Sequence, residues 1–303
     1  IKTYFRRTER PKSIKKASIT YQTSSGAGLG LVDDTNKIVL VPKTLPGDYV
    51  EIQLARHYHL YAEGELLKVL HSLTERRDEL VVCSKFNECS GCQFQMLGYD
   101  DQLQTKEDYI KRAYRFYYPE LDQTRYPYFG VVTESPMQYA YRSKLTPHYR
   151  NPKNFPDLQI GFNSVFGGKP VVDVEYCPIA TEPVNLMLPD VRKQERERDP
   201  LHNKDKTLFL RETLRLNHKT GEHHKGCITD PKRVCTTRIN KRMYQFEAGE
   251  FFQNNDYILP EVIDYIKYQI EQSGEIDSLV DTYCGSGFFG IALADFVKGK
   301  IFG

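Results

Sequence analysis

IDSLVDTYCGSGFFGIALADFVKGKIFG, residues 276–303, is the stretch that decides the fold class. An apolar run opens it, and a glycine-rich turn, a helix-like run and a second apolar segment follow. Gly285, Gly287 and Gly290 satisfy the pattern G-x-G-x-x-G between a strand and a helix, which is the context that the pattern requires. This order predicts the beginning of a parallel α/β sheet with a ligand crevice at its carboxyl edge.

Each part of this turn has a physical role. Gly285 permits a sharp change of direction, and Gly287 lets the backbone approach a ligand closely. The following helix offers unpaired N–H groups at its start, and Asp281 adds a carboxylate at the end of the strand. The motif fits a dinucleotide and S-adenosylmethionine equally well, and a purely structural turn is a third interpretation.

The sequence stops soon after this turn. A ribose-binding carboxylate is expected about 20 residues past the first glycine, which lies beyond Gly303. One strand, one helix and the start of another strand do not complete a doubly wound sheet. We therefore expect the chain to be a fragment of a longer polypeptide.

Residues 256–275, DYILPEVIDYIKYQIEQSGE, precede this stretch and predict a helix. Pro260 falls in its first turn, and Gly274 ends it. One face carries the apolar residues Ile258, Leu259, Val262, Ile263, Ile266 and Ile270.

A cluster of thiols lies further back, in VCSKFNECSGCQFQ at residues 82–95. Cys83, Cys89 and Cys92 are the thiols of this loop, and a tetrahedral site needs a fourth. Cys177 is the best candidate because it ends a strand-like run in VEYCPIA. A [4Fe–4S] cluster and zinc are the two candidate occupants, although a zinc ribbon would more usually show two Cys-x2-Cys pairs. Unligated buried cysteines are the alternative.

The N-terminal part predicts a small β-structure. Residues 17–72 contain five short β-rich runs separated by turn residues, which is typical of a five-stranded barrel. Residues 1–16 form a basic arm with seven Lys or Arg against one Glu, which fits either phosphate binding or a solvated tail. Downstream, residues 98–118 predict a helix, and the charge-dense run at 192–206 predicts an exposed loop or linker.

Composition sets outer limits on the function. The chain has 303 residues, enough for two or three domains, and a net charge of +2 that does not by itself indicate nucleic-acid binding. No apolar run approaches the ~18 residues of a membrane span. The seven cysteines, an odd number, do not indicate a secreted disulfide framework. We expect an intracellular protein of unresolved compartment.

Taken together, the motifs make the chain resemble the RNA uracil-5-methyltransferases. GAGLGLV and LPGDYVEIQL look like the TRAM domain of that family, and CSKFNECSGCQFQ with Cys177 looks like its iron–sulfur pattern. YRSK at 141–144, FEAGEFFQNN at 246–255 and DTYCGSGFFG at 281–290 follow in the family's order. CSGCQFQ and FFQNN are most similar to the fungal-type tRNA enzymes.

The resemblance implies a multidomain fold of α+β and α/β parts. A basic arm at 1–16 would precede an OB-like TRAM barrel of five strands at 17–72. A central β-rich domain at 73–248 would hold the cysteine cluster, with the helix at 98–118 packed on the methyltransferase domain. Residues 249–303 would begin a Rossmann-like methyltransferase domain that binds S-adenosylmethionine.

The resemblance also implies roles for single residues. S-adenosylmethionine would be bound by Gln253, Asp281, Tyr283, Gly285 and Gly287. A [4Fe–4S] cluster of structural rather than redox function would be held by Cys83, Cys89, Cys92 and Cys177. RNA would be contacted by Arg142, Lys144 and Phe251, with Lys144, His148 and Arg150 forming a basic strip and Tyr141 or Tyr149 stacking on bases.

The activity implied is methylation of carbon 5 of a uridine. A cysteine adds to carbon 6 of the base, carbon 5 then attacks the methyl group, and a base removes the proton. The family's nucleophile and catalytic glutamate are expected beyond residue 303, and Cys284 is assigned to the cofactor turn. We expect a monomer that acts on tRNA at a T-loop uridine, with 23S rRNA as the alternative substrate. A non-enzymatic RNA-binding module with a structural metal site, and an iron–sulfur electron carrier, are the alternatives of other classes.

Overall fold

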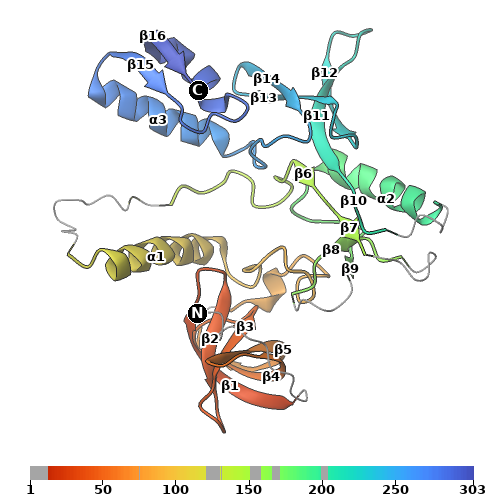
Figure 1. Ribbon diagram of the computed structural model, residues 1–303, viewed down its shortest axis with the longest axis vertical. Coiled ribbons are helices and arrows are strands. Elements are labelled where there is room, and N and C mark those ends of the chain that lie inside the picture. The colour runs from red at the N-terminus through yellow and green to blue at the C-terminus, as the bar shows by residue number, and fades with distance from the viewer. Residues whose placement is uncertain are drawn as a thin grey trace. The chain divides into compact units, whose positions relative to one another are not determined.

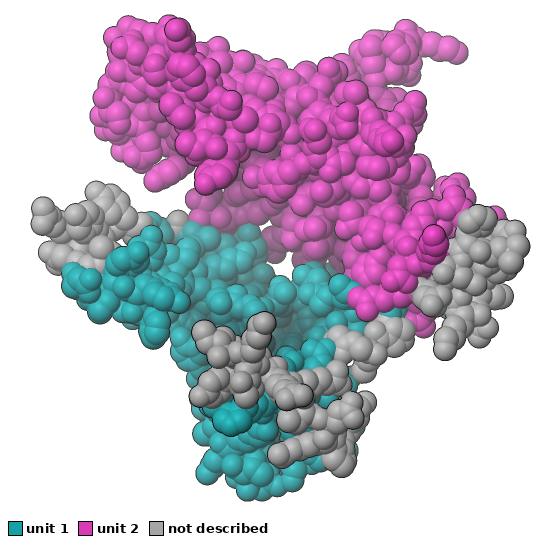
Figure 2. Space-filling model, in the orientation of Figure 1, with its two compact units in different colours: residues 1–132, 163–172 teal, residues 133–162, 173–303 magenta. Residues whose placement is uncertain are grey.

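The computed structural model describes residues 13–74, 76–120, 130, 132–150, 158–165, 171–198 and 204–303. The chain divides into two compact units, coloured separately in Figure 2. Unit 1 comprises residues 1–132 and 163–172, and unit 2 comprises residues 133–162 and 173–303. Most of the basic arm predicted at 1–16 lies outside the described residues.

Unit 1 begins with a closed five-stranded barrel, drawn in red and orange in Figure 1. Its strands are β1 (Ile14–Gln22), β2 (Ala27–Val32), β3 (Ile38–Pro42), β4 (Asp48–His57) and β5 (Tyr61–Ser72). They close in the order β1-β2-β3-β5-β4, with β3 and β5 parallel and the other pairs antiparallel. The predicted barrel is confirmed, and its first strand begins three residues before the expected start at residue 17.

The barrel forms because its strands alternate between buried and exposed side chains. In β4 the inward residues Val50 and Ile52 are fully buried, as are Val39 and Val41 of β3. Gly30 is required where β1 and β2 approach, because a Cβ at this position would lie 2.1 Å from the carbonyl oxygen of Ser18.

A 3-10 turn η1 (Asp78–Leu80), the cysteine loop and helix α1 (Tyr99–Tyr117) follow in unit 1. The helix predicted at 98–118 is therefore present, and no residue of it is buried. It contacts the barrel, because the guanidinium of Arg112 lies 4.5 Å from the centre of the Tyr21 ring. Its expected packing on the methyltransferase part, which belongs to unit 2, stays a prediction.

Unit 2 begins with short strands around one long helix. In chain order the elements are β6 (Lys144–Leu145), β7 (His148–Tyr149), β8 (Gly161–Phe162), β9 (Val172–Asp173), α2 (Glu182–Arg196), β10 (Lys206–Thr207), β11 (Leu210–Leu216), β12 (His223–Ile228), β13 (Val234–Ile239) and β14 (Arg242–Glu247). The sheets have the orders β10-β7-β8-β9, β12-β11-β6 and β13-β14. Val184 and Leu188 of α2 are fully buried and pack against Leu210 of β11.

The end of unit 2 has the predicted strand–turn–helix–strand order. Helix α3 (Leu259–Ser273) is followed by β15 (Ile276–Val280), α4 (Phe288–Ala292), the 3-10 turn η3 (Ala294–Phe296) and β16 (Val297–Phe302). Strands β15 and β16 are parallel, as an α/β unit requires. Gly274, at φ +86°, ends α3 as expected.

The first part of the charge-dense run at 192–206 is helical and not the exposed loop that its composition predicted, and residues 199–203 lie outside the described residues. Helix α2 continues to Arg196, and Arg192 is only 2% exposed. Its guanidinium donates to Asp173 at 2.7 Å, and the carboxylate of Glu195, also buried, accepts from the Tyr149 hydroxyl at 3.0 Å. These charges are buried because each has a partner from a distant segment, which composition alone does not reveal.

No helix within the described ranges is both long enough and apolar enough to cross a membrane.

Removal of the Asp173 carboxylate should strongly destabilise unit 2. In Asp173→Ala the buried Arg192 would keep only Glu175, 3.6 Å away and largely exposed, as an ionic neighbour. Breaking one side of a buried pair costs about 3 kcal/mol. Urea unfolding should show that loss, whereas the control Glu197→Ala, whose pair with Lys193 is exposed, should cost less than about 1 kcal/mol. Equal losses in the two variants would contradict the buried pair.

Candidate methyl-donor and RNA site

The glycine turn between β15 and α4 has the backbone geometry that its sequence predicted. Gly285 has φ +52° and Gly287 has φ +73°, both in the left-handed region that favours glycine. The Gly287 N–H donates to the carbonyl of Cys284 at 2.8 Å, which closes the turn. Helix α4 has only five residues, so the turn itself rather than a helix N-terminus shapes this edge.

Asp281 stands directly after β15, at the start of the turn. Its N–H donates to the Phe302 carbonyl at 2.8 Å, which fixes the backbone beside β16. Its Oδ2 is buried and has no hydrogen-bond partner within the described part of the chain. A buried acceptor without a partner needs a donor, and a ligand hydroxyl or amino group would supply one. Tyr283, 95% exposed, lies in the same turn. The turn therefore fits a nucleoside-type ligand.

The segment FFQNN joins this turn from upstream. The Ser286 hydroxyl donates to the Phe251 carbonyl at 2.9 Å. Phe252 is buried and stacks on Phe246, with ring centres 4.5 Å apart, whereas the Phe251 side chain is 68% exposed. Gln253 is exposed as well. Side chains thus alternate along this segment: Phe252 is buried in the core, and its neighbours Phe251 and Gln253 are exposed.

The segment YRSK is bound to the other end of FFQNN. The Ser143 N–H donates to the Asn254 carbonyl at 2.9 Å, and Arg142 forms isolated β-bridges with Asn255 and Ala180. The Arg142 Nε donates to the Lys144 carbonyl at 3.1 Å. Three motifs that lie far apart in the sequence are therefore joined within unit 2.

The basic strip expected near YRSK is only partly available. Burial lowers the pKa of Lys144, and the charges of Arg211 and Arg142 lower it further. Tyr149 is 3% exposed, and burial together with its bond to Glu195 raises its pKa to about 12. Tyr149 is therefore not exposed for stacking on a base, and stacking by the alternative residue, Tyr141, stays a prediction. Arg150 is exposed.

Arg211, on β11, is a positioning residue that the sequence did not indicate. It is 1% exposed, and its guanidinium donates to the carbonyls of Ala248 at 2.7 Å, Glu250 at 2.9 Å and Phe252 at 3.4 Å. It therefore fixes the backbone on which FFQNN begins. An arginine inside a strand pattern carries no signal for such a role.

The cysteine loop lies in unit 1, around Lys43. The Lys43 ammonium donates to the Cys92 carbonyl and lies 4.3 Å from the centre of the Phe86 ring. Burial lowers the pKa of Lys43, and the neighbouring thiols of Cys92, Cys89 and Cys83 act in the opposite direction. Burial raises the pKa of Cys89.

The predicted fourth ligand, Cys177, belongs to unit 2, where its N–H donates to the Asn185 side chain at 3.0 Å. Among the described residues, no group of three Cys, His, Asp or Glu side chains could hold a metal ion as they stand. Ligation by Cys83, Cys89, Cys92 and Cys177 therefore stays a prediction.

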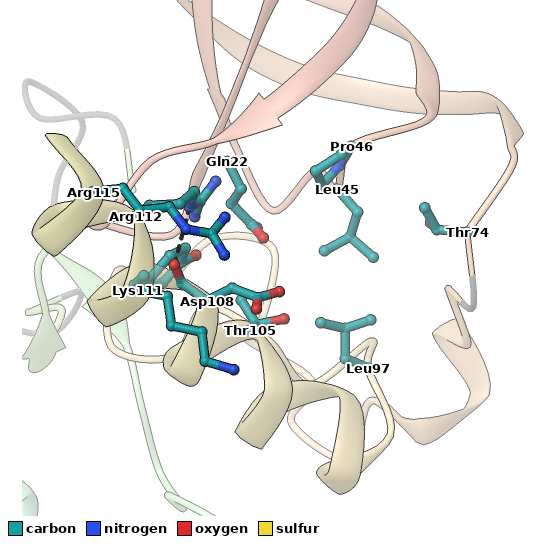
Figure 3. Close-up of a pocket in the computed structure, with 11 residues that line it drawn as sticks. Gln22, Leu45, Pro46, Thr74, Leu97, Thr105, Asp108, Lys111, Arg112 and Arg115 are labelled. Carbon is teal, nitrogen blue, oxygen red and sulfur yellow. Dashed lines mark hydrogen bonds between the residues drawn. The ribbon is translucent and has the colours of Figure 1, made fainter. Parts of the chain in front are cut away.

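A second candidate surface lies in unit 1, where α1 faces the barrel (Figure 3). The cleft has a volume of about 430 Å³. Figure 3 shows Lys111, Arg112 and Arg115 on the helix side and Gln22 and Leu45 on the barrel side. Lys111 is paired with Glu107, and Arg112 also lies 5.0 Å from the Tyr109 ring. Arg115 is exposed. Three cations against the carboxylate of Asp108, together with Tyr109, make the lining of the cleft net cationic and partly aromatic.

Comparison with known proteins agrees with this geometry. Residues 11–67 match the TRAM domain. The chain is 36% identical over 286 residues to the tRNA (uracil(54)-C(5))-methyltransferase of Schizosaccharomyces pombe, covering 91% of this chain and 53% of that protein. It is 30% identical over 338 residues to the Saccharomyces cerevisiae protein of the same name, covering 92% and 53%.

A solved structure is also similar in fold. The crystal structure of Pyrococcus abyssi tRNA (uracil-54, C5)-methyltransferase in complex with S-adenosyl-L-homocysteine aligns with a TM-score of 0.58 and 20% identity. The alignment covers 92% of this chain and 70% of that one. A 23S rRNA (uracil(1939)-C(5))-methyltransferase from Shewanella denitrificans is 26% identical over 175 residues, covering 57% of this chain and 36% of that protein.

The comparisons point to one class, the RNA uracil-5-methyltransferases: the chain carries a TRAM domain and is similar over nine tenths of its length to two proteins named as members of that class. Within that class it is similar to the fungal tRNA (uracil(54)-C(5))-methyltransferases, as the wording of its motifs indicated. The chain spans about half the length of these curated relatives.

The two buried thiols of unit 2 should be chemically inert. Burial raises the pKa of Cys227 to about 11, from 9.0, and that of Cys235 in the same direction. At about pH 8, Cys227 should hold about 100-fold less thiolate than an unperturbed thiol and be alkylated more slowly in proportion. Peptide mapping after iodoacetamide treatment, with the same protein unfolded in denaturant as control, checks this. Equal labelling of Cys227 in the folded and unfolded protein would be incompatible with its burial.

Proposed function

We propose that the full-length protein is an S-adenosylmethionine-dependent RNA methyltransferase that methylates carbon 5 of a tRNA uridine of the T-loop type. The observation that carries this proposal is that hydrogen bonds join the glycine turn, FFQNN and YRSK. The Ser286 hydroxyl donates to the Phe251 carbonyl, and Asn254 and Asn255 form backbone contacts with Ser143 and Arg142 of YRSK. The similarity to two tRNA (uracil(54)-C(5))-methyltransferases over nine tenths of this chain supports the substrate.

On this proposal, S-adenosylmethionine supplies the methyl group and the chain binds and orients both substrates. The free Oδ2 of Asp281 would accept a hydrogen bond from the cofactor, and the Gly285–Gly287 turn would let it approach the backbone. The exposed side chains of Gln253 and Phe251 stand beside this turn, where they would contact the cofactor and the target base. The nucleophilic cysteine and the catalytic base are proposed to lie beyond residue 303.

The cationic cleft of unit 1 would bind the phosphates of the RNA, and the protein would act as a monomer. Phosphate contacts position a nucleic acid, whereas contacts to bases specify it. A 23S rRNA substrate remains the second candidate, because a relative with that activity matches over 57% of the chain.

Gly287→Ala should abolish tight binding of the cofactor product. At φ +73° an added Cβ is strained, and the turn that would receive the nucleoside must shift. Calorimetry of the full-length protein with S-adenosyl-L-homocysteine should show at least about 10-fold weaker binding, a loss of about 1.4 kcal/mol.

The matched control is Gly221→Ala. Gly221 has φ +72° in the turn between β11 and β12, and a Cβ there meets nothing within 4 Å. The backbone strain is therefore the same, while the cofactor turn is untouched. Unchanged binding in Gly287→Ala, or an equal loss in both variants, would exclude this turn as the cofactor site.

Arg115→Gln should lower both RNA affinity and its salt dependence. Each neutralised phosphate contributes a slope of about 0.7–0.9 to the logarithm of the binding constant against the logarithm of salt concentration. Filter binding of a tRNA transcript should show the slope reduced by about one such contribution. Lys106→Gln, the same charge change at an exposed position of α1 outside the cleft, serves as control. Equal salt dependence of RNA binding in Arg115→Gln and the unaltered protein would show that the cleft does not bind RNA phosphates.

A further inference from the structure

A cavity of about 170 Å³ in unit 2 is lined by none of the residues assigned above to the cofactor. Strands β11, β12 and β13 supply part of its lining, and Tyr141, Ser143, Asp256 and Tyr257 supply another part. The share of liquid volume of one water molecule is about 30 Å³, so the cavity has room for far more than a single bridging water.

Three residues that line this cavity each carry a buried oxygen atom without a hydrogen-bond partner among the described residues: Thr181 Oγ1, Glu212 Oε2 and Asp256 Oδ1. Thr181 is 3% exposed, and the Glu212 side chain is 10% exposed. Few buried polar groups in folded proteins remain unpaired, and three around one cavity call for a donor inside it.

The other oxygen of each carboxylate is already engaged. Asp256 Oδ2 accepts from the Thr237 hydroxyl at 2.8 Å, and Glu212 Oε1 accepts from the Lys225 ammonium at 2.8 Å. One oxygen of each carboxylate therefore holds its side chain in place, and the second oxygen, Asp256 Oδ1 or Glu212 Oε2, is left without a partner among the described residues. Burial raises the pKa of Asp256, and the charge of Glu212 raises it further, so a donated hydrogen bond is worth more here than in water.

The chemistry of the lining selects the class of donor. Lys225 already balances Glu212, and its ammonium lies 5.6 Å from the centre of the Tyr257 ring. The walls thus combine carboxylate and hydroxyl groups with the cations of Lys225 and Arg238 and with the aromatic residues Tyr141 and Tyr257. Acceptors beside aromatic rings suit a planar group that carries N–H donors, which describes the Watson–Crick edge of a base with an exocyclic amino group.

The cavity lies beside two segments that are expected to contact RNA. Ser143 belongs to YRSK, and Asp256 and Tyr257 follow FFQNN without a gap. We propose that this cavity binds one unstacked, amino-bearing base of the substrate RNA, distinct from the uridine that is methylated. The inference rests on the proposed function, because it assumes that RNA lies along these two segments.

The test measures a double-mutant cycle between the cavity and single amino groups of the RNA. Asp256→Asn keeps the size of the side chain but replaces one acceptor with an amide, and Thr181→Val removes a hydroxyl at nearly constant shape. Glu222→Gln, an exposed carboxylate in the turn between β11 and β12, is the matched control. The full-length protein and a tRNA transcript are used, and unfolding curves identify any variant that fails to fold.

The RNA is altered one nucleotide at a time, with inosine for guanosine, purine riboside for adenosine and a 4-deoxy analogue for cytidine. At one position, loss of the amino group should weaken binding to the unaltered protein about 10-fold. The same loss should change binding to Asp256→Asn and Thr181→Val by less than about 3-fold, because the first variant has lost the charge and one acceptor of the carboxylate and the second has lost the hydroxyl. Glu222→Gln should behave like the unaltered protein.

The outcomes separate this inference from the proposed function. If no position shows coupling with either variant while the RNA still binds, the cavity holds ordered water only and the inference is overturned. If the unaltered full-length protein binds neither the transcript nor S-adenosyl-L-homocysteine, the proposed function itself fails. Coupling at the methylated uridine alone, tested with the same variants, would also overturn the assignment of a separate base.

Discussion

The buried guanidinium of Arg211 is the interaction on which the site in unit 2 depends. Its bonds to the carbonyls of Ala248, Glu250 and Phe252 fix the chain as it leaves β14 and enters FFQNN. Burial lowers its pKa, while the nearby groups of Cys235 and Asp256 act in the opposite direction. A cation so deeply buried is tolerable because backbone oxygens satisfy it. Its planar fork holds several carbonyls at once, which a lysine could not do in the same way.

The site is therefore assembled by backbone hydrogen bonds rather than by contacts between its functional side chains. The Phe251 carbonyl accepts a hydrogen bond from the Ser286 hydroxyl, and the Asn254 carbonyl accepts one from the Ser143 N–H. Main-chain bonding on both sides leaves the side chains of Phe251 and Gln253 exposed beside the cofactor turn. A scaffold of this kind holds groups for a ligand without using them for its own stability.

Local patterns explain what the sequence could predict. The barrel, helices α1 and α3 and the glycine turn all follow from alternation, helical spacing or left-handed glycines, which need no knowledge of distant segments. The helix around Arg192 was missed because its partner Asp173 lies 19 residues away. The same reason hid Arg211, and it hid the cavity, whose three free acceptors come from separate segments. Cysteine spacing predicted a ligand set but not whether the fold gathers those thiols.

The charge of the chain as a whole does not explain an affinity for RNA. A net charge of +2, from 42 basic and 40 acidic residues, gives no general attraction for a polyanion. Affinity must then come from local cations, such as those of α1 around Arg115. The cavity beside Asp256 and Glu212 combines these two carboxylates with Lys225 and Arg238, so it adds no net positive charge. On the proposed function, the cations of α1 would contact the RNA backbone and position it, whereas specificity would come from contacts of exposed side chains such as Phe251 with the bases.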